Sequence, residues 1–314
     1  MILSIICQRP TGGTETTMND TGKIIICEPD FAALLKPGAE LCLLAGGFQF
    51  LEGPTWYPCR NGLVFSDIPA DTMYLWTAAD GVKPFRVPSH HANGNTLDEQ
   101  NRLVTCEHGS RRVTRTEDDG RITVLADRYQ DKRLNSPNDI TVQRDGTVWF
   151  SDPPYGIRPE EQEQPACFVF RRDLDGTLTA VADDFIKPNG LCFSPDEKIL
   201  YVSDTANERH HIRRFAVQPD KSLKGGEVFA VIAPGKSDGF RVDAAGRIWT
   251  SSGEGIWCLS PAGRLLGKIL VPEIPSNCAF GGDDGQTLFI TARTGLYAIC
   301  ISFPVTKLGI MASE

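Results

Sequence analysis

A short strand-like pattern recurs six times along the chain, and this repeat limits the possible folds more than any other feature. The copies are rich in β-branched and aromatic residues, as strands are. With Ser66, Thr105, Ser151, Ser203, Ser251 and Thr291 as reference points, the intervals between copies run from 39 to 52 residues. A strand repeat of this period is typical of propeller blades. The six copies read GLVFSD, RLVTCE, TVWFSD, ILYVSD, RIWTSS and TLFITA.

The surroundings of each copy predict a four-stranded sheet. A tight turn precedes most copies, for example at residues 60–62 and 143–146, as a hairpin requires. A third strand pattern follows each copy, and in most repeats a D-G or A-G turn then leads to a fourth. Four strands per repeat, stacked radially, predict an all-β fold, the six-bladed β-propeller.

The two ends of the chain fit ring closure. The last repeat ends after its third strand at about Phe303, whereas residues 40–46 form an isolated strand pattern before the first repeat. We therefore expect residues 40–46 to complete the last blade. Residues 30–35 predict a short helix outside the ring with Asp30 as its N-cap. Residues 1–22 are expected to be a disordered extension, and residues 23–314 a single propeller domain.

Composition excludes several classes of partner. The chain has 32 basic and 40 acidic residues, a net charge of −8 and no run of Lys and Arg, which argues against nucleic-acid and membrane partners. The opening MILSIIC is too short for a secretory signal, and no segment is apolar for long enough to span a membrane. No two of the ten cysteines are closer than fifteen positions, so no C-x-x-C site exists and we expect a reduced, cytoplasmic protein.

A polar residue with a side-chain oxygen opens the first strand of every repeat, 12 to 14 residues before the reference Ser or Thr. These residues are Glu52, Asn93, Asn138, Asn189, Asp238 and Asn277. Asn and Asp also favour turns, so six turn residues are the alternative interpretation. If the first strand of each blade is innermost, the six side chains form a ring around the central channel, which we call the channel ring.

Oxygen ligands without His or Cys suit a hard cation. Ca²⁺ accepts six to eight oxygen ligands in irregular geometry, so calcium is the expected occupant, with Zn²⁺, Mn²⁺ or Mg²⁺ as alternatives. The carboxylates of Glu52 and Asp238 would neutralise its charge, and the Asn amides would add further donors.

The motifs EGPTW, SPNDI with WFSDPPYG, KPNGLCFSPD with LYVSDT, and SDGFRVDAAGRIW resemble the gluconolactonase and regucalcin (senescence marker protein) family, in particular its bacterial gluconolactonases. The resemblance covers residues 28–303. It implies a six-bladed propeller with one divalent cation, held by Glu52, Asn189 and Asp238, with Asn138 at the metal or the substrate. Ser136 stands where regucalcin has an arginine that contacts sugar, so we expect different polyol contacts here.

Two further motifs have simpler explanations than catalysis. Residues 235–239 spell G-x-S-x-G around Ser237, but a nucleophile elbow needs a following helix and a later His. A strand, a turn and a second strand follow instead, and no His occurs after His211. The DLDG of residues 173–176 resembles the start of a calcium loop, but no Glu closes a twelve-residue loop, so we expect a hairpin turn.

Three residues near the expected channel mouth are candidates for substrate binding in addition to Asn138. Asn93 belongs to the channel ring, His91 precedes it, and Tyr155 lies in the loop after the third copy of the repeat. A solvated loop is the alternative explanation for His91. In a propeller, the loop that contains Tyr155 and the segments that lead into the first strands lie at the same mouth of the channel. We therefore expect Tyr155 to line the pocket.

These residues and the resemblance together predict calcium-dependent hydrolysis of a sugar lactone, such as D-glucono-1,5-lactone, to the aldonic acid. The metal would polarise the lactone carbonyl, and Asp238 would activate the attacking water. Glu52, in a motif stiffened by Pro54, is expected to be a fixed ligand. The alternatives are hydrolysis of another ester, a phosphotriester or an aromatic lactone, and a calcium-binding propeller without catalysis. The expected partner is a small-molecule lactone, and the sequence does not define the oligomeric state.

Overall fold

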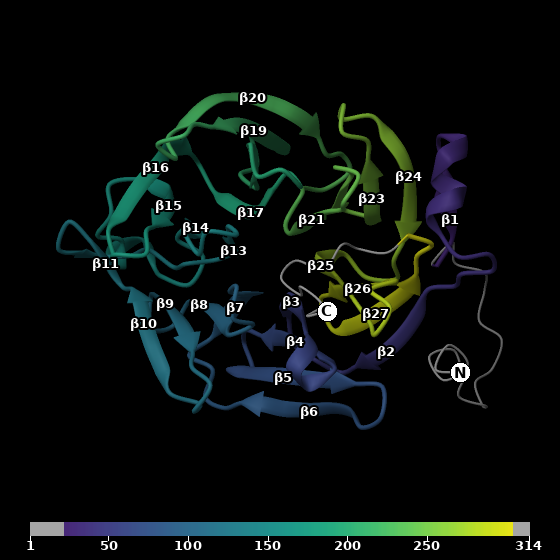
Figure 1. The fold of residues 1–314 in the computed structure, drawn as a ribbon, viewed down its shortest axis with the longest axis horizontal. Coiled ribbons are helices and arrows are strands. Elements are labelled where there is room, and N and C mark those ends of the chain that lie inside the picture. Colours follow the sequence, from purple (N-terminus) through teal and green to yellow (C-terminus); the bar gives the residue numbers. More distant parts are fainter. Residues whose placement is uncertain (1–21, 304–314) are drawn as a thin grey trace, which may run out of the picture.

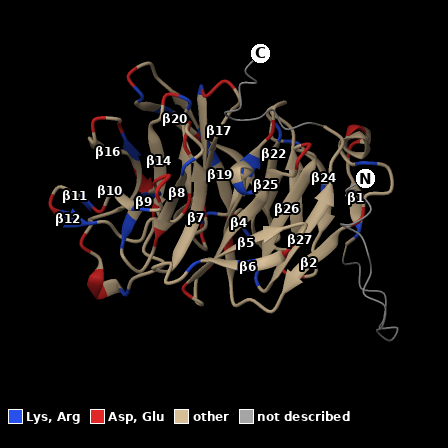
Figure 2. Cartoon of the chain, turned by 60° about the horizontal axis from the view of Figure 1, so that its bottom comes forward, with Lys and Arg blue, Asp and Glu red and all other residues tan. Residues whose placement is uncertain are grey.

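The computed structural model describes residues 22–303 as six sheets arranged radially around a central channel (Figure 1). The six-bladed propeller expected from the repeat is confirmed. Each blade is an antiparallel sheet, and its first strand lies nearest the central channel (Figure 1). Lys, Arg, Asp and Glu lie mainly in the connecting loops and at strand ends (Figure 2).

The strands of the first three blades follow the repeat in order. Blade 1 contains β3 (Leu51–Tyr57), β4 (Gly62–Asp67), β5 (Thr72–Thr77) and β6 (Gly81–Arg86). Blade 2 contains β7 (Ala92–Leu97), β8 (Leu103–Glu107), β9 (Arg112–Thr116) and β10 (Ile122–Ala126). Blade 3 contains β13 (Ile140–Val142), β14 (Val148–Asp152), β15 (Cys167–Arg172) and β16 (Leu178–Phe185).

The other three blades complete the circle. Blade 4 contains β17 (Pro188–Phe193), β18 (Ile199–Asp204), β19 (His211–Val217) and β20 (Leu223–Val231). Blade 5 contains β21 (Phe240–Val242), β22 (Ile248–Ser251), β23 (Gly255–Leu259) and β24 (Leu265–Leu270), and blade 6 contains β25 (Pro275–Gly281), β26 (Thr287–Ala292) and β27 (Gly295–Cys300). Short elements between blades are β11 (Arg128–Tyr129), β12 (Lys132–Arg133), η3 (Pro58–Arg60) and η4 (Pro159–Glu161).

Blade 6 is closed by a strand from the start of the chain, as the sequence predicts. Strand β2 (Cys42–Gly46) pairs antiparallel with β27, and the register runs from Cys42 opposite Ala298 to Gly46 opposite Gly295. In Figure 1 the purple β2 lies beside the yellow β27. This pairing satisfies backbone groups that would otherwise form an open sheet edge.

The segment before β2 belongs to the core of blades 5 and 6. Strand β1 (Ile24–Ile26), which the sequence did not reveal, adds a fifth strand to blade 5 by pairing with β24. The expected helix is the 3₁₀ helix η2 (Pro29–Leu34); the prediction of Asp30 as its N-cap is wrong, because Glu28 occupies that position and no side chain caps the helix. Phe31 is fully buried, with its ring centroid 5.9 Å from that of Trp249.

The predicted extension, residues 1–22, lies outside the described part of the chain except for Gly22. The N–H of Gly22 donates to Leu270 O at 3.0 Å, at the end of blade 5. Within residues 22–303 no helix is long and apolar enough to cross a bilayer.

Candidate functional site

The six residues of the channel ring open the inner strands at one end of the channel. Asp238 is partly exposed at the mouth, and the other five are buried. A residue without a side chain follows the ring residue in four blades because neighbouring inner strands approach closely. A Cβ on Gly94 would lie 2.5 Å from Asn138 O, and one on Gly190 would lie 2.4 Å from Asp238 O. Both glycines use this proximity: Gly94 N donates to Asn138 O at 2.8 Å and Gly190 N to Asp238 O at 2.9 Å.

The carboxylates of the channel ring lie close enough to affect each other's protonation. Burial, then the charges of Asp238 and Asp139, raise the pKa of Glu52 well above its ordinary value. Burial, followed by the charge of Asp139, raises the pKa of Asp238 to about 7, while an amide hydrogen bond from Asn189 and the charge of Lys236 lower it. The structure therefore brings Glu52, Asn189 and Asp238 together.

Asp139 is a third carboxylate of the channel that the sequence analysis missed. It is 1% exposed and occupies the position that is Gly in four blades, directly after Asn138. Asn277 Nδ2 lies 3.5 Å from Asp139 Oδ2 and 3.2 Å from Glu52 Oε2, so one amide bridges the two acids. A carboxylate in a slot that otherwise holds small residues was the available sequence signal.

Arg241 is the second missed residue, and it supplies positive charge beside these acids. Its Nη1 lies 3.8 Å from Asp139 Oδ2, and the same atom donates to the carbonyl of Phe240 at 2.8 Å. Its Nη2 lies 3.4 Å from Pro54 O. Because Pro54 and Arg241 belong to blades 1 and 5, this side chain bridges the channel between distant parts of the sequence.

Asn93 contacts a buried histidine that the sequence analysis also missed. Asn93 Nδ2 lies 3.1 Å from His108 Nε2, and burial, with a smaller effect of the His91 charge, lowers the pKa of His108 to about 4. His108 is therefore neutral at pH 7, and it can accept the amide proton of Asn93. Asn93 Oδ1 is buried without a hydrogen-bond partner. An unsatisfied buried acceptor of this kind fits a cation or a donor group of a ligand.

His91 lies in the loop beside Asn93 and is exposed. Its Nδ1 is 2.8 Å from Ile68 O, and its backbone N–H donates to Asp71 Oδ1 at 2.8 Å. These contacts tie His91 to the preceding blade. A role for its free ring edge in substrate binding stays a prediction.

Tyr155 lies on the side of the channel ring formed by Asn189 and Asp238. Its hydroxyl hydrogen-bonds with Thr205 Oγ1, and Lys187 Nζ lies 5.2 Å from its ring centroid. Burial raises the pKa of Tyr155 to about 12, and the nearby charge of Asp238 also raises it, so the phenol keeps its proton at neutral pH. Ser136 is used to hold the Tyr155 loop, since its Oγ accepts the N–H of Gly156 at 2.9 Å.

Ser237 is a structural residue of the lead-in to β21. The residue is 1% exposed, and its hydroxyl lies 2.7 Å from Thr250 Oγ1. The segment that follows is a strand, as expected, so the geometry of a nucleophile elbow is not present around Ser237.

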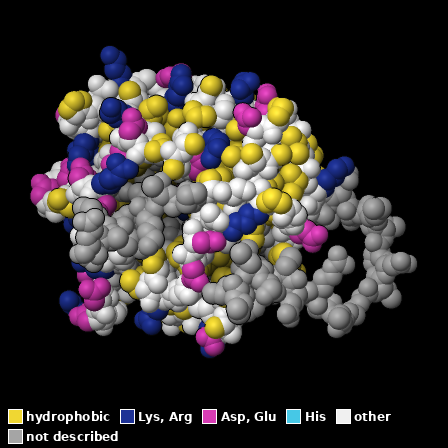
Figure 3. All heavy atoms as spheres, turned by 45° about the vertical axis from the view of Figure 1, so that its right-hand side comes forward, with side chains coloured by type: hydrophobic (Ala, Val, Ile, Leu, Met, Phe, Trp, Pro, Cys, Tyr) yellow, Lys and Arg dark blue, Asp and Glu magenta, His cyan; other side chains and the backbone are white. Residues whose placement is uncertain are grey.

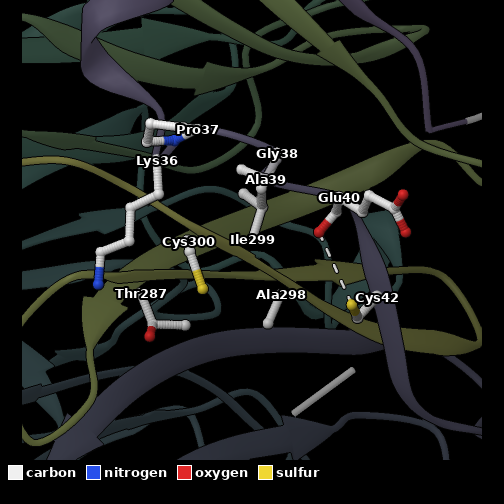
Figure 4. Close-up of a pocket in the computed structure, with 10 residues that line it drawn as sticks. All are labelled: Lys36, Pro37, Gly38, Ala39, Glu40, Cys42, Thr287, Ala298, Ile299 and Cys300. Atoms are coloured by element: carbon white, nitrogen blue, oxygen red, sulfur yellow. Dashed lines mark hydrogen bonds between the residues drawn. The ribbon is translucent and has the colours of Figure 1, made fainter. Parts of the chain in front are cut away.

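A cavity of about 210 Å³ lies away from the channel ring, at the outer side of blade 6. Residues 36–40, Cys42 and residues of β26 and β27, including Thr287 and Ala298, line it (Figure 4). None of the ring residues contributes to this cavity, so the channel mouth is the better candidate site. Among the described residues on the face shown in Figure 3, acidic and basic side chains are interspersed and form no basic patch for a polyanionic partner.

Known proteins with related sequences and structures share this architecture. A family model described as "SMP-30/Gluconolactonase/LRE-like region" matches residues 50–294. The chain is 33% identical over 315 residues to a gluconolactonase of Zymomonas mobilis, covering 90% of this chain and 88% of that protein. It is 25% identical to regucalcin of Sus scrofa over 81% of this chain and 87% of that protein. A solved gluconolactonase from Xanthomonas campestris superimposes with a TM-score of 0.83 and 40% identity, covering 88% of this chain and 94% of that chain.

Proposed function

The chain belongs to the SMP-30/gluconolactonase/LRE-like family, and from that premise we propose that it hydrolyses the ester bond of a sugar lactone such as D-glucono-1,5-lactone. The observation that carries the proposal is the convergence of Glu52, Asp139 and Asp238 with ring amides at one mouth of the channel. The groups around that mouth are polar, as the hydroxyl-rich surface of a sugar requires. They include Asn93, Tyr155 and His108.

The residues present fit a hard divalent cation. Within residues 22–303 no set of three His, Cys, Asp or Glu side chains is arranged to hold a metal, so a cation would depend on Asn oxygens as well as on carboxylates. The charges of Asp238 and Asp139 raise the pKa of Glu52, and the charge of Asp139 raises the pKa of Asp238. A calcium ion held by Glu52, Asn138, Asn189 and Asp238 would remove this repulsion. When bound, such an ion polarises the lactone carbonyl and stabilises the developing oxyanion.

The side chains of the chain then divide the remaining tasks. Asp238 is the proposed general base: its carboxylate takes a proton from water as the water oxygen attacks the carbonyl carbon. The ester C–O bond of the lactone then breaks. Asp238 returns the proton to the oxygen of that bond, which becomes a hydroxyl group of the aldonic acid. Asn93, Asn138 and Tyr155 are proposed to orient the sugar hydroxyls. His91, at the edge of the mouth, is a further candidate for this contact.

Hydrolysis of D-glucono-1,5-lactone with and without a chelator tests the function directly. We expect turnover with calcium, loss of turnover in excess EGTA and recovery when calcium is added back. The reason is that the proposed cation, held in part by the carboxylates of Glu52 and Asp238, polarises the lactone carbonyl. Ser237→Ala should retain activity. Inactivity across a panel of sugar lactones would favour a calcium-binding propeller without catalysis. Faster turnover of an aromatic lactone, another ester or a phosphotriester would show that this compound class is the preferred substrate instead.

The raised pKa of Asp238 predicts how calcium binding depends on pH. Without metal, the folded site keeps a proton up to pH of about 7, whereas an unfolded aspartate releases it near 3.8. The stability contributed by this proton is therefore lost as pH rises through 7. Calcium must displace the proton, so its affinity should fall as pH decreases from 8 to 6.

Melting temperatures in calcium and in EGTA at pH 6, 7 and 8 measure this effect. The difference between the two should grow with pH, since ligand binding to the folded state stabilises it. Acids whose charge does not influence the calcium site affect both conditions alike and cancel in the difference. In Asp238→Asn the pH dependence of the difference should be much flatter. A wild-type difference that is constant from pH 6 to 8 would contradict the proposal.

A further inference from the structure

The Ser-Asp pairs that end three copies of the repeat have no role in the site described so far. They end the second strands of blades 1, 3 and 4, and their acids are Asp67, Asp152 and Asp204. These three carboxylates are at most 2% exposed, and their hydrogen bonds are with groups other than the channel-ring side chains. A buried carboxylate is costly unless hydrogen bonds compensate its lost hydration.

Each of the three carboxylates accepts two backbone N–H groups from the segment before its ring residue, one on each oxygen. Asp204 also accepts the N–H of Ala206 at 3.2 Å and Nη1 of Arg209 at 3.3 Å. The donors to Asp67 are Gln49 and Phe50, both at 3.0 Å. The donors to Asp152 are Asn135 at 2.7 Å and Ser136 at 2.8 Å. The donors to Asp204 are Ile186 at 2.9 Å and Lys187 at 3.0 Å.

The position of the donors is the same in all three blades. They lie three and two residues before the ring residue of the same blade, which is Glu52, Asn138 or Asn189. In each case the earlier donor bonds Oδ2 and the later donor bonds Oδ1. The aspartate thus holds the chain immediately before its ring residue in a fixed direction.

The remaining blades hold their ring residues by other means. In blade 2 the carboxylate of Glu107 is bonded by Arg112, Ser110 and Thr114, and Asp71 of the preceding blade accepts the N–H groups of Ser89 and His91 instead. Blades 5 and 6 have Ser252 and Ala292 after the repeat residue. Asp238 is held through its own N–H, which donates to Ser251 Oγ at 2.8 Å.

The three blades with this arrangement carry three of the four side chains proposed to hold the cation. We propose that Asp67, Asp152 and Asp204 are positioning residues, which fix the backbone that aims Glu52, Asn138 and Asn189 at a common point. This inference rests on the proposed function. Charge-assisted hydrogen bonds of this length are strong, and groups that orient metal ligands commonly change metal affinity by about 10- to 100-fold when they are removed.

Calcium titration of Asp204→Asn by calorimetry tests the inference with a readout other than activity. The amide can accept only one of the two N–H groups and presents its own N–H₂ to the other, so the lead-in to Asn189 must shift. We expect the calcium affinity to fall about 10- to 100-fold. The melting temperature in EGTA should fall as well.

Asp243→Asn is the matched control. Asp243 is also 1% exposed and accepts two backbone N–H groups, from Ala245 at 2.9 Å and Arg247 at 3.0 Å. It lies in the turn between β21 and β22, at the end of these strands that is opposite the ring. We expect Asp243→Asn to lower the melting temperature in EGTA, while its calcium affinity stays within about twofold of that of wild type.

Equal calcium affinities for Asp204→Asn and Asp243→Asn would overturn the inference. If Asp204→Asn does not fold, Asp67→Asn gives the same comparison for Glu52, and Asp152→Asn for Asn138. If wild type itself binds no calcium, the proposed cation is refuted and the inference is judged on lactone turnover instead. There kcat of the three variants should fall at least tenfold below that of Asp243→Asn, and equal values would overturn it.

Discussion

Asp238→Asn is expected to lower the turnover of D-glucono-1,5-lactone by about two to four orders of magnitude, the usual loss when a general base is removed. The amide keeps the size of the side chain and one ligand oxygen but has no basicity. The loss should persist at saturating calcium, where weaker metal binding is compensated. The measurement is kcat at increasing calcium, corrected for the spontaneous hydrolysis of the lactone.

Asn138→Ala is the comparison variant for Asp238→Asn. It removes a proposed metal or substrate contact and leaves the carboxylate of Asp238 in place. Its main effect should therefore be on KM or on the calcium requirement. Recovery of Asp238→Asn to near wild-type turnover in excess calcium would show that Asp238 only holds the metal. The base would then have to be another carboxylate of the channel, Glu52 or Asp139.

Deletion of residues 1–46 is expected to abolish cooperative unfolding. It removes β2, so the backbone groups of β27 lose their partners and blade 6 becomes an open edge. It also removes Phe31 from the core between blades 5 and 6. Thermal unfolding followed by circular dichroism measures the result, and a sharp transition near the wild-type temperature would contradict the closure assignment.

Two variants separate the causes of this effect. Deletion of residues 1–21 leaves both β1 and β2 in place and should melt like wild type. Phe31→Ala removes the packing of this ring, including its contact with Trp249, and leaves β2 in place. It should lower the free energy of unfolding by about 3–5 kcal/mol, the usual loss for a buried Phe, within a single transition. If Phe31→Ala alone abolished the transition, the loss in the 1–46 deletion could not be assigned to β2.

The repeat predicted the fold because each blade is a local structure. The hairpin turns and strand patterns of one blade are encoded in about 40 to 50 consecutive residues. The isolated pattern at residues 40–46 could then be assigned to blade 6, because the last repeat ends after its third strand. Strand β1 was missed because three residues, Ile24–Ile26, give too short a pattern to stand out. The cap of η2 was assigned wrongly because Phe31 packing against Trp249, rather than an Asp30 side chain, holds that segment.

The sequence by itself determined which side chains open the inner strands, since their spacing from the repeat residue is nearly constant. It did not reveal the roles of Asp139, Arg241 or His108. It also did not reveal that buried aspartates hold the backbone that precedes three of the ring residues. Asp139 and Arg241 interact across blades, between residues that are up to 187 positions apart in the chain, as in the bond from Arg241 to Pro54. His108 and the buried aspartates bond groups of their own blade that are 15 to 18 positions away. Only the tertiary structure decides such contacts, because burial and the distance between charges, which set the protonation of Glu52 and Asp238, exist only when the ring is closed.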